Sequence, residues 1–282
     1  DRFDLELYPS ASRNYQLPTT NYQLSLYDPE GRTEPLLKKL GIKYRKIDGF
    51  GDAAKEERLV IGEFALKGED YAILPEDLER GLRVLILRQA QAVWTSLGLR
   101  TEQTTSRLQF KRDQFDPAFA DIANEDLAYW RGTPKEYGKL PFFNIHSMRG
   151  PRWLKTHSVS EYSCVIPTRL GWHTYIDGEF GLQYGSYMSF SYGRGGLYLT
   201  TLDLGCNLDD PAAMKVAGAV FRSFADGEVA GVRPVVPCGE RLTKYAVDHL
   251  CCEEGAKAAD EANAVYFVGL DAKETFAEYW TT

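Results

Sequence analysis

The chain has 282 residues, of which 33 are basic and 40 are acidic, so its net charge is −7, and 44% of its residues are hydrophobic. At roughly 100 to 200 residues per domain, this length suits one large domain followed by part of another. Sequence-independent binding to nucleic acid requires a basic face, which this acidic composition does not indicate. The longest apolar runs are far shorter than the roughly 20 residues of a membrane-spanning helix. We therefore predict a globular chain with no nucleic-acid partner and no membrane span.

The chain starts at Asp1 with neither a Met nor a leader of basic and then apolar residues. We expect a piece of a longer polypeptide, in which residues 1–20 are a linker or the remnant of a preceding domain. The cysteines are irregularly spaced and include no C-x-x-C pair, which argues against a disulfide framework and a zinc site. Buried free thiols are their expected state.

Short apolar strands alternate with helices in residues 22–98. The expected strands are 22–27, 42–47, 58–61 and 83–87, and the expected helices are 34–40, 75–80 and 89–97. Thr33 is placed to cap the first helix, and Gly41 suits its left-handed end. Strands separated by helices pair in parallel through right-handed crossovers. The alternation therefore predicts an α/β protein with an open, mostly parallel sheet between two layers of helices.

The pattern changes in the second half of the domain. Residues 107–153 form a loose, aromatic-rich segment, which we interpret as an insertion or an elaborated connection. Alternation from 182 to 192 and a glycine turn at 193–196 predict an antiparallel hairpin near the end of the sheet. Asp209 or Asp210 then precedes Pro211 at the start of a helix, and Gly227 lies just beyond its end. The expected domain covers residues 21–227.

Residues 228–282 repeat the order and spacing of the first elements. Strands are expected at 232–236 and 264–269, with a helix at 241–250 between them. The offset from the corresponding elements near the start of the chain is just over two hundred residues. We expect this tail to be the start of a second, similar α/β unit.

No motif indicates a metal, a cofactor or a nucleophile. The four histidines lack H-x-x-x-H and H-x-E spacing, and neither a phosphate loop nor G-x-G-x-x-G follows a strand. The sharp turn after the strand 83–87 carries Arg88 and Gln89, where a nucleophile elbow would need Ser or Cys. The sequence therefore predicts no catalytic residue, no metal and no cofactor.

Candidates for ligand binding occur at two kinds of position. The turns after the expected parallel strands carry Arg88 and Gln89, together with Asp28 and Glu63, and open α/β sheets bind ligands at such turns. Arg88 beside an acid would mark an anion or sugar site. Trp130 and Trp172 are candidates for stacking on sugar rings, with a place in the core or an interface as the favoured alternative for each.

Several runs resemble a known family. Residues 26–31 (LYDPEG), 59–62 (LVIG) and 84–89 (VLILRQ) resemble the class I glutamine amidotransferase-like domains, which have a flavodoxin-type fold. The runs 115–117, 125–132, 180–184, 193–199 and 210–213 resemble the versions found as accessory domains in large bacterial glycoside hydrolases of the β-galactosidase type. The resemblance covers about residues 20–226. Active family members carry a Cys at the elbow and a His with an acidic partner on a later loop, and this sequence has neither.

The resemblance implies a degenerate module without catalytic residues, that is, a pseudoenzyme. It would serve packing, oligomerisation or cleft shaping in a secreted or periplasmic enzyme that degrades carbohydrate. Its implied partners are the catalytic and β-sandwich domains of that parent enzyme, with carbohydrate and a second copy of the chain as further partners. Two alternatives remain: a carbohydrate-binding module with exposed aromatic residues, and a self-contained sugar-utilisation hydrolase.

Overall fold

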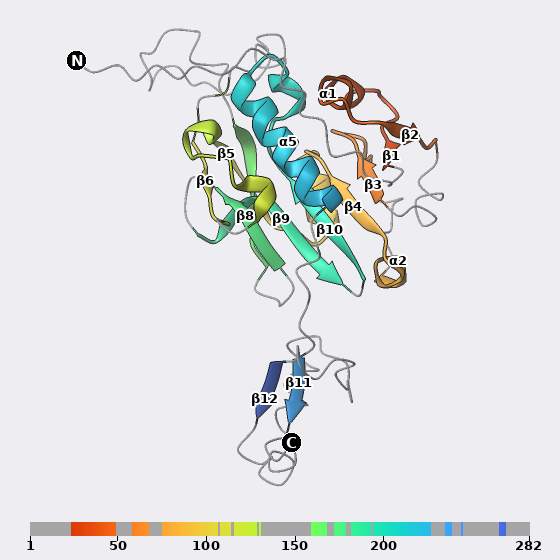
Figure 1. Cartoon of the computed structure of the whole chain (residues 1–282), viewed down its shortest axis with the longest axis vertical. Coiled ribbons are helices and arrows are strands. Elements are labelled where there is room, and N and C mark those ends of the chain that lie inside the picture. Colours follow the sequence, from red (N-terminus) through yellow and green to blue (C-terminus); the bar gives the residue numbers. More distant parts are fainter. Residues whose placement is uncertain are drawn as a thin grey trace, which may run out of the picture. The chain divides into compact units, whose positions relative to one another are not determined.

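Figure 1 shows the computed structural model of the chain. The structure describes residues 24–48, 58–67, 75–106, 108–113, 116–128, 130, 159–167, 172–178, 182–192, 194–226, 235–238, 244 and 265–268. The chain divides into two compact units, one formed by residues 1–166 and 173–227 and the other by residues 167–172 and 228–282. The expected linker at residues 1–20 lies outside the described residues.

Five parallel strands form one half of the main sheet. They are β1 (Leu24–Tyr27), β2 (Tyr44–Lys46), β3 (Arg58–Ile61), β4 (Arg83–Ile86) and β10 (Gly195–Thr200). Their order across the sheet is β2-β1-β3-β4-β10, and every neighbouring pair is parallel. Counted along the chain, this is the 2-1-3-4-5 order of flavodoxin-like folds. All four residues of β3 are buried, as expected for a parallel strand covered on both faces. The predicted fold class is confirmed.

Antiparallel strands form the other half of the sheet. They are β5 (Thr101–Ser106), β6 (Phe110–Lys111), β7 (Ser160–Val165), β8 (Trp172–Asp177) and β9 (Tyr184–Tyr192). The predicted hairpin is β9–β10, but β10 lies in the middle of the sheet, where it pairs with parallel β4 on one side and antiparallel β9 on the other. Pairing then continues from β9 to β7 and from β7 to β5. Because β5 has the polar sequence TEQTTS, no apolar pattern indicated this extension.

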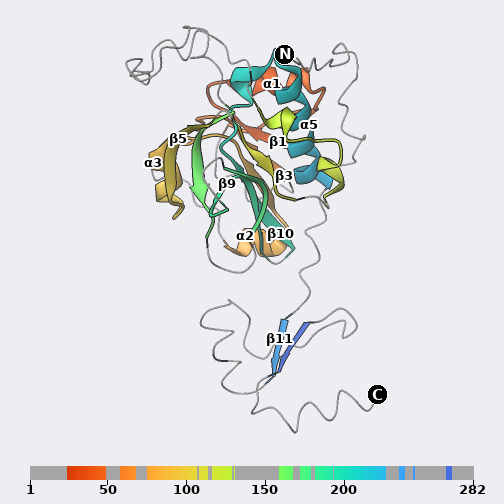
Figure 2. The same cartoon turned by 90° about the vertical axis from the view of Figure 1, so that its left-hand side faces the viewer.

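Helices cover both faces of the sheet. The α-helices are α1 (Glu34–Lys39), α2 (Pro75–Arg80), α3 (Gln91–Ser96) and α5 (Pro211–Asp226), and the short 3-10 helices are η2 (Pro117–Phe119), η3 (Glu125–Leu127) and η5 (Gly205–Asn207). Figure 2 shows α1 and α5 on one side of the sheet and α3 on the other. The carboxylate of Asp210 accepts the backbone N–H groups of Ala212 and Ala213, so Asp210 rather than Asp209 caps α5.

The main core lies between α5 and the sheet. Phe221 and Phe224 of α5 and Tyr187 of β9 have no exposed surface. The described part of the loose segment 107–153 also belongs to this layer, because η2 and η3 pack against α5. Phe119 of η2 stacks on Tyr175 of β8 with 5.7 Å between the ring centroids. The described part of this segment therefore helps to build the core on the α5 face.

The second unit is described only in part. Its strands β11 (Val235–Cys238) and β12 (Val265–Val268) form a parallel pair with Val235 opposite Val265. Lys244, the one described residue between them, is helical. The idea of a second, similar α/β unit stays a prediction, because most of residues 228–282 lie outside the described residues. Within the described ranges, no helix combines the length and the apolar character that crossing a membrane requires.

Candidate functional site

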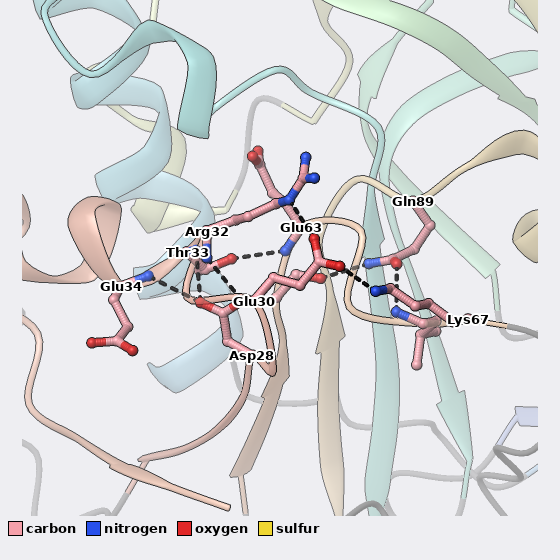
Figure 3. Close-up of polar contacts among 10 residues, drawn as sticks. Asp28, Glu30, Arg32, Thr33, Glu34, Glu63, Lys67 and Gln89 are labelled. Atoms are coloured by element: carbon pink, nitrogen blue, oxygen red, sulfur yellow. Dashed lines mark hydrogen bonds and ion pairs between the residues drawn. The ribbon is translucent and has the colours of Figure 1, made fainter. Parts of the chain in front are cut away.

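The carboxyl ends of the parallel strands meet at one edge of the sheet. In flavodoxin-like folds, ligands bind at this edge, where the strand order reverses between β1 and β3. The loops that follow β1, β3, β4 and β10 contribute polar side chains here, and Figure 3 shows those of the first three loops. We therefore take this edge as the candidate site and consider each loop in turn.

The loop after β1 is organised by Asp28, which is 1% exposed. Its carboxylate accepts the backbone N–H groups of Arg32 (3.1 Å), Thr33 (2.7 Å) and Glu34 (3.2 Å). Thr33 takes the predicted N-cap position of α1, but its side chain makes no capping hydrogen bond. Asp28 binds the N–H groups there, and the Thr33 hydroxyl accepts the N–H of Glu63 at 2.7 Å. Thr33 thus links the loop after β1 to the loop after β3.

The loop after β3 is tightly packed. Gly62 has no room for a side chain, since a Cβ would lie 2.8 Å from the Thr33 hydroxyl and 2.9 Å from the Asp28 carboxylate. Glu63 is 4% exposed, and its carboxylate accepts the N–H of Gly205 at 2.9 Å. Phe64 has a φ of +54°, a left-handed conformation that non-glycine residues rarely adopt, and its N–H donates to the Arg88 carbonyl at 2.9 Å. This loop is bonded to both of its neighbours.

The loop after β4 carries Arg88 and Gln89, the two residues at the predicted elbow. Gln89 is fully buried, and its amide donates to the carbonyls of Gly62 (2.7 Å) and Leu87 (2.8 Å) and accepts the N–H of Leu66 (3.1 Å). Gln89 therefore holds the β3 and β4 loops together. These bonds engage both ends of its side-chain amide, which makes Gln89 a structural residue at this edge.

Arg88 pairs with a residue that the sequence did not single out. Its guanidinium lies 2.5 Å from the carboxylate of Asp203, which follows β10, and both side chains are almost completely buried. Arg88 also contacts the Cys206 sulfur at 3.0 Å and lies 4.7 Å from the centre of the Phe64 ring. β10 ends at Thr200, which places Asp203 in the loop that follows this strand. Had the end of β10 been placed correctly in the sequence, Asp203 would have joined the polar residues that follow the parallel strands.

The outer part of the site is exposed and charged. The Glu30 carboxylate lies between the Arg32 guanidinium, at 2.8 Å, and the Lys67 ammonium, with which it also forms an ion pair (Figure 3). These bonds, that to Lys67 first and that to Arg32 next, lower the pKa of the Glu30 carboxyl. Arg32 also lies over the Phe64 ring at 5.3 Å from its centre. Arg32 and Lys67 are thus exposed cations of this edge, whereas Arg88 is enclosed.

The two tryptophan candidates do not belong to the loops of this edge. Trp130 has no exposed surface, and its indole N–H donates to the Asp126 carbonyl at 2.7 Å. A sugar-stacking platform needs an exposed ring face, which Trp130 does not offer. Trp172 begins β8 and is half-buried. The structure therefore groups Arg88 and Gln89 at this edge, whereas the two tryptophans belong to other elements.

The described residues contain no group of three or more His, Cys, Asp or Glu side chains that could hold a metal ion. Cys164 and Cys206 are buried and are not joined in a disulfide. Burial raises the pKa of the Cys164 thiol to about 12, so it stays protonated at neutral pH. Cys238 lies in β11, and Cys251 and Cys252 lie outside the described residues.

Comparison with known proteins assigns no activity to this site. No family model matches the sequence, and no curated protein matches it. Among solved structures, the chain is similar to a protein of Thermoplasma acidophilum that is described as a GMP synthase component, with 8% identity, a TM-score of 0.38, and coverage of 71% of this chain and 93% of that one. A cytoplasmic protein of Salmonella typhimurium gives 9% identity, a TM-score of 0.43, and coverage of 72% and 99%.

These similarities are too low to carry an argument about activity. The class of the protein follows from its own strand order, which makes it an α/β protein of flavodoxin-like type. Neither of these two structures is described as a glycoside hydrolase.

Proposed function

We propose that this chain is a non-catalytic, amidotransferase-like accessory region of a carbohydrate-degrading glycoside hydrolase, where it serves packing, oligomerisation or cleft shaping. One observation carries the non-catalytic part. The turn after β4, where an amidotransferase-like enzyme needs its nucleophile, holds Arg88 and Gln89, and both side chains bind neighbouring loops.

The chemistry of these residues supports the same conclusion. A guanidinium stays protonated and cannot act as a nucleophile, and an amide is neither an acid nor a base near neutral pH. The carboxylates of Asp28 and Glu63 accept backbone N–H groups, so they fix the loops in place. The glycoside hydrolase context rests on the sequence resemblance of residues 115–213 alone.

The test is a joint turnover and binding screen of the full chain. Ammonia release from glutamine, cleavage of chromogenic glycosides and calorimetric binding of oligosaccharides would be measured side by side. We expect no turnover in either assay and no saturable oligosaccharide binding. Light scattering would report association with a second copy, or with a β-galactosidase-type catalytic domain added in trans.

Two results would overturn the proposal. Turnover that disappears in Glu63→Gln or Asp203→Asn, while the variant still folds, would show that the buried carboxylates are catalytic. Oligosaccharide binding without turnover, abolished by Trp172→Ala, would favour the carbohydrate-binding module instead.

A further inference from the structure

Three charged side chains from two loops of the candidate edge form a compact group. Glu30 and Arg32 follow β1, and Lys67 follows β3, so the group spans the point at which the strand order reverses. The relative exposures of the Arg32 and Lys67 side chains are 47% and 68%. Both cations therefore face solvent at the position where flavodoxin-like folds bind ligands.

The Glu30 carboxylate binds both cations at once. One of its oxygens lies 2.8 Å from the Arg32 Nε atom, and the other pairs with the Lys67 ammonium (Figure 3). An external carboxylate or phosphate group would make the same kind of contacts, because guanidinium and ammonium groups recognise oxyanions through charge-assisted hydrogen bonds. Glu30 thus stands where such a group would bind.

Arg32 is also held in place. Arg32 lies over the Phe64 ring, and the backbone N–H of Arg32 is bound by Asp28. Two acidic side chains of the same loops, Asp28 and Glu63, are buried and accept backbone N–H groups, and Glu34 pairs with Lys38 and Lys46. Their negative charges are thereby partly compensated, so they oppose an incoming anion less than free carboxylates would.

From this arrangement we infer that Arg32 and Lys67 form a binding site for an oxyanion, and that Glu30 occupies this site as an internal competitor. Exposed ion pairs of this kind are weak, so an external anion can displace the carboxylate. The low pKa of the Glu30 carboxyl keeps it charged at neutral pH, as a competitor must be. This site does not depend on the proposed accessory role.

The test measures binding of radiolabelled inorganic phosphate by equilibrium dialysis at low ionic strength, where charge interactions are least screened. Glu30→Gln removes the competitor and keeps the shape of the side chain. We expect it to lower the dissociation constant for phosphate about two- to tenfold relative to the wild type. Adding Arg32→Gln or Lys67→Gln to this variant should reverse the gain. Acetate, which presents the same group as Glu30, should displace the phosphate.

Asp209→Asn is the matched control. Asp209 is an exposed acid that pairs with Lys39 of α1 at 3.1 Å, so its loss changes the net charge of the chain by the same amount. We expect phosphate binding of this variant to equal that of the wild type. Equal gains in Asp209→Asn and Glu30→Gln would show a bulk charge effect and overturn the site. An unchanged Glu30→Gln, or failure of acetate to compete, would overturn it as well.

Discussion

Replacing Arg88 by Met tests whether the buried ion pair holds the loops of the candidate edge together. The substitution removes the guanidinium that contacts Asp203, Cys206 and the Phe64 ring, and it leaves the Asp203 carboxylate buried. Removing one partner of a buried pair costs about 3–5 kcal/mol. At about 2–4 °C per kcal/mol for a unit of this size, the melting temperature should fall by about 6–20 °C.

Thermal unfolding followed by tryptophan fluorescence measures this shift, because Trp94 and Trp130 are buried in the first unit. Arg100→Met is the control, since Arg100 pairs with Glu102 at 3.6 Å and is largely exposed. It should change stability by less than about 0.5 kcal/mol. Adding Asp203→Leu to Arg88→Met should recover part of the loss, because the uncompensated charge is then removed. A shift for Arg88→Met no larger than that of the control would refute this reasoning.

Three further results are expected. Asp28→Ala frees the three N–H groups of the loop before α1 and should lower the free energy of unfolding by about 2 kcal/mol, seen as a lower urea midpoint; an unchanged midpoint would contradict the role of Asp28. A side-chain hydrogen bond from Lys46, and weaker ones from Tyr44 and Lys38, lower the pKa of the Glu34 carboxyl from 4.5 to about 2. The Glu34 carboxylate therefore contributes its full stabilisation above pH 4.5, and this contribution is lost as the pH falls towards 2. Glu34→Gln should remove this part of the acid transition, and an identical transition in both proteins would argue against it. Cys164 should resist alkylation by iodoacetamide at pH 8 until the chain unfolds, whereas rapid labelling of its peptide in mass spectrometry would show that the thiol is accessible.

Much of the candidate edge was visible in the sequence because local patterns define where parallel strands end. Asp28, Glu63, Arg88 and Gln89 directly follow expected strands, and the structure brings all four to one edge. Their roles were not visible. The partner of Arg88 lies 115 residues away in the chain, and no local pattern connects the two.

The tryptophan candidates show the same limit. A tryptophan on an exposed binding surface and a tryptophan in the core look identical in the sequence, and only the packing around the side chain distinguishes them. Trp130 is fully buried and its indole N–H donates to the Asp126 carbonyl of η3, so its ring has no free face. The sequence also did not indicate the proposed oxyanion site at Arg32 and Lys67, because that site requires the loops after β1 and β3 to lie side by side.

The sequence by itself determined the parallel half of the fold. Apolar runs of strand length, alternating with capped helices, allow few arrangements other than parallel pairing through crossovers. Beyond the predicted β9–β10 hairpin, tertiary structure alone decided the antiparallel half, because strands such as β5 are polar and are held by backbone bonds to β7. It also decided which charges of the candidate edge are enclosed and which face solvent. Burial depends on what packs around a side chain, and that is settled only when distant segments meet.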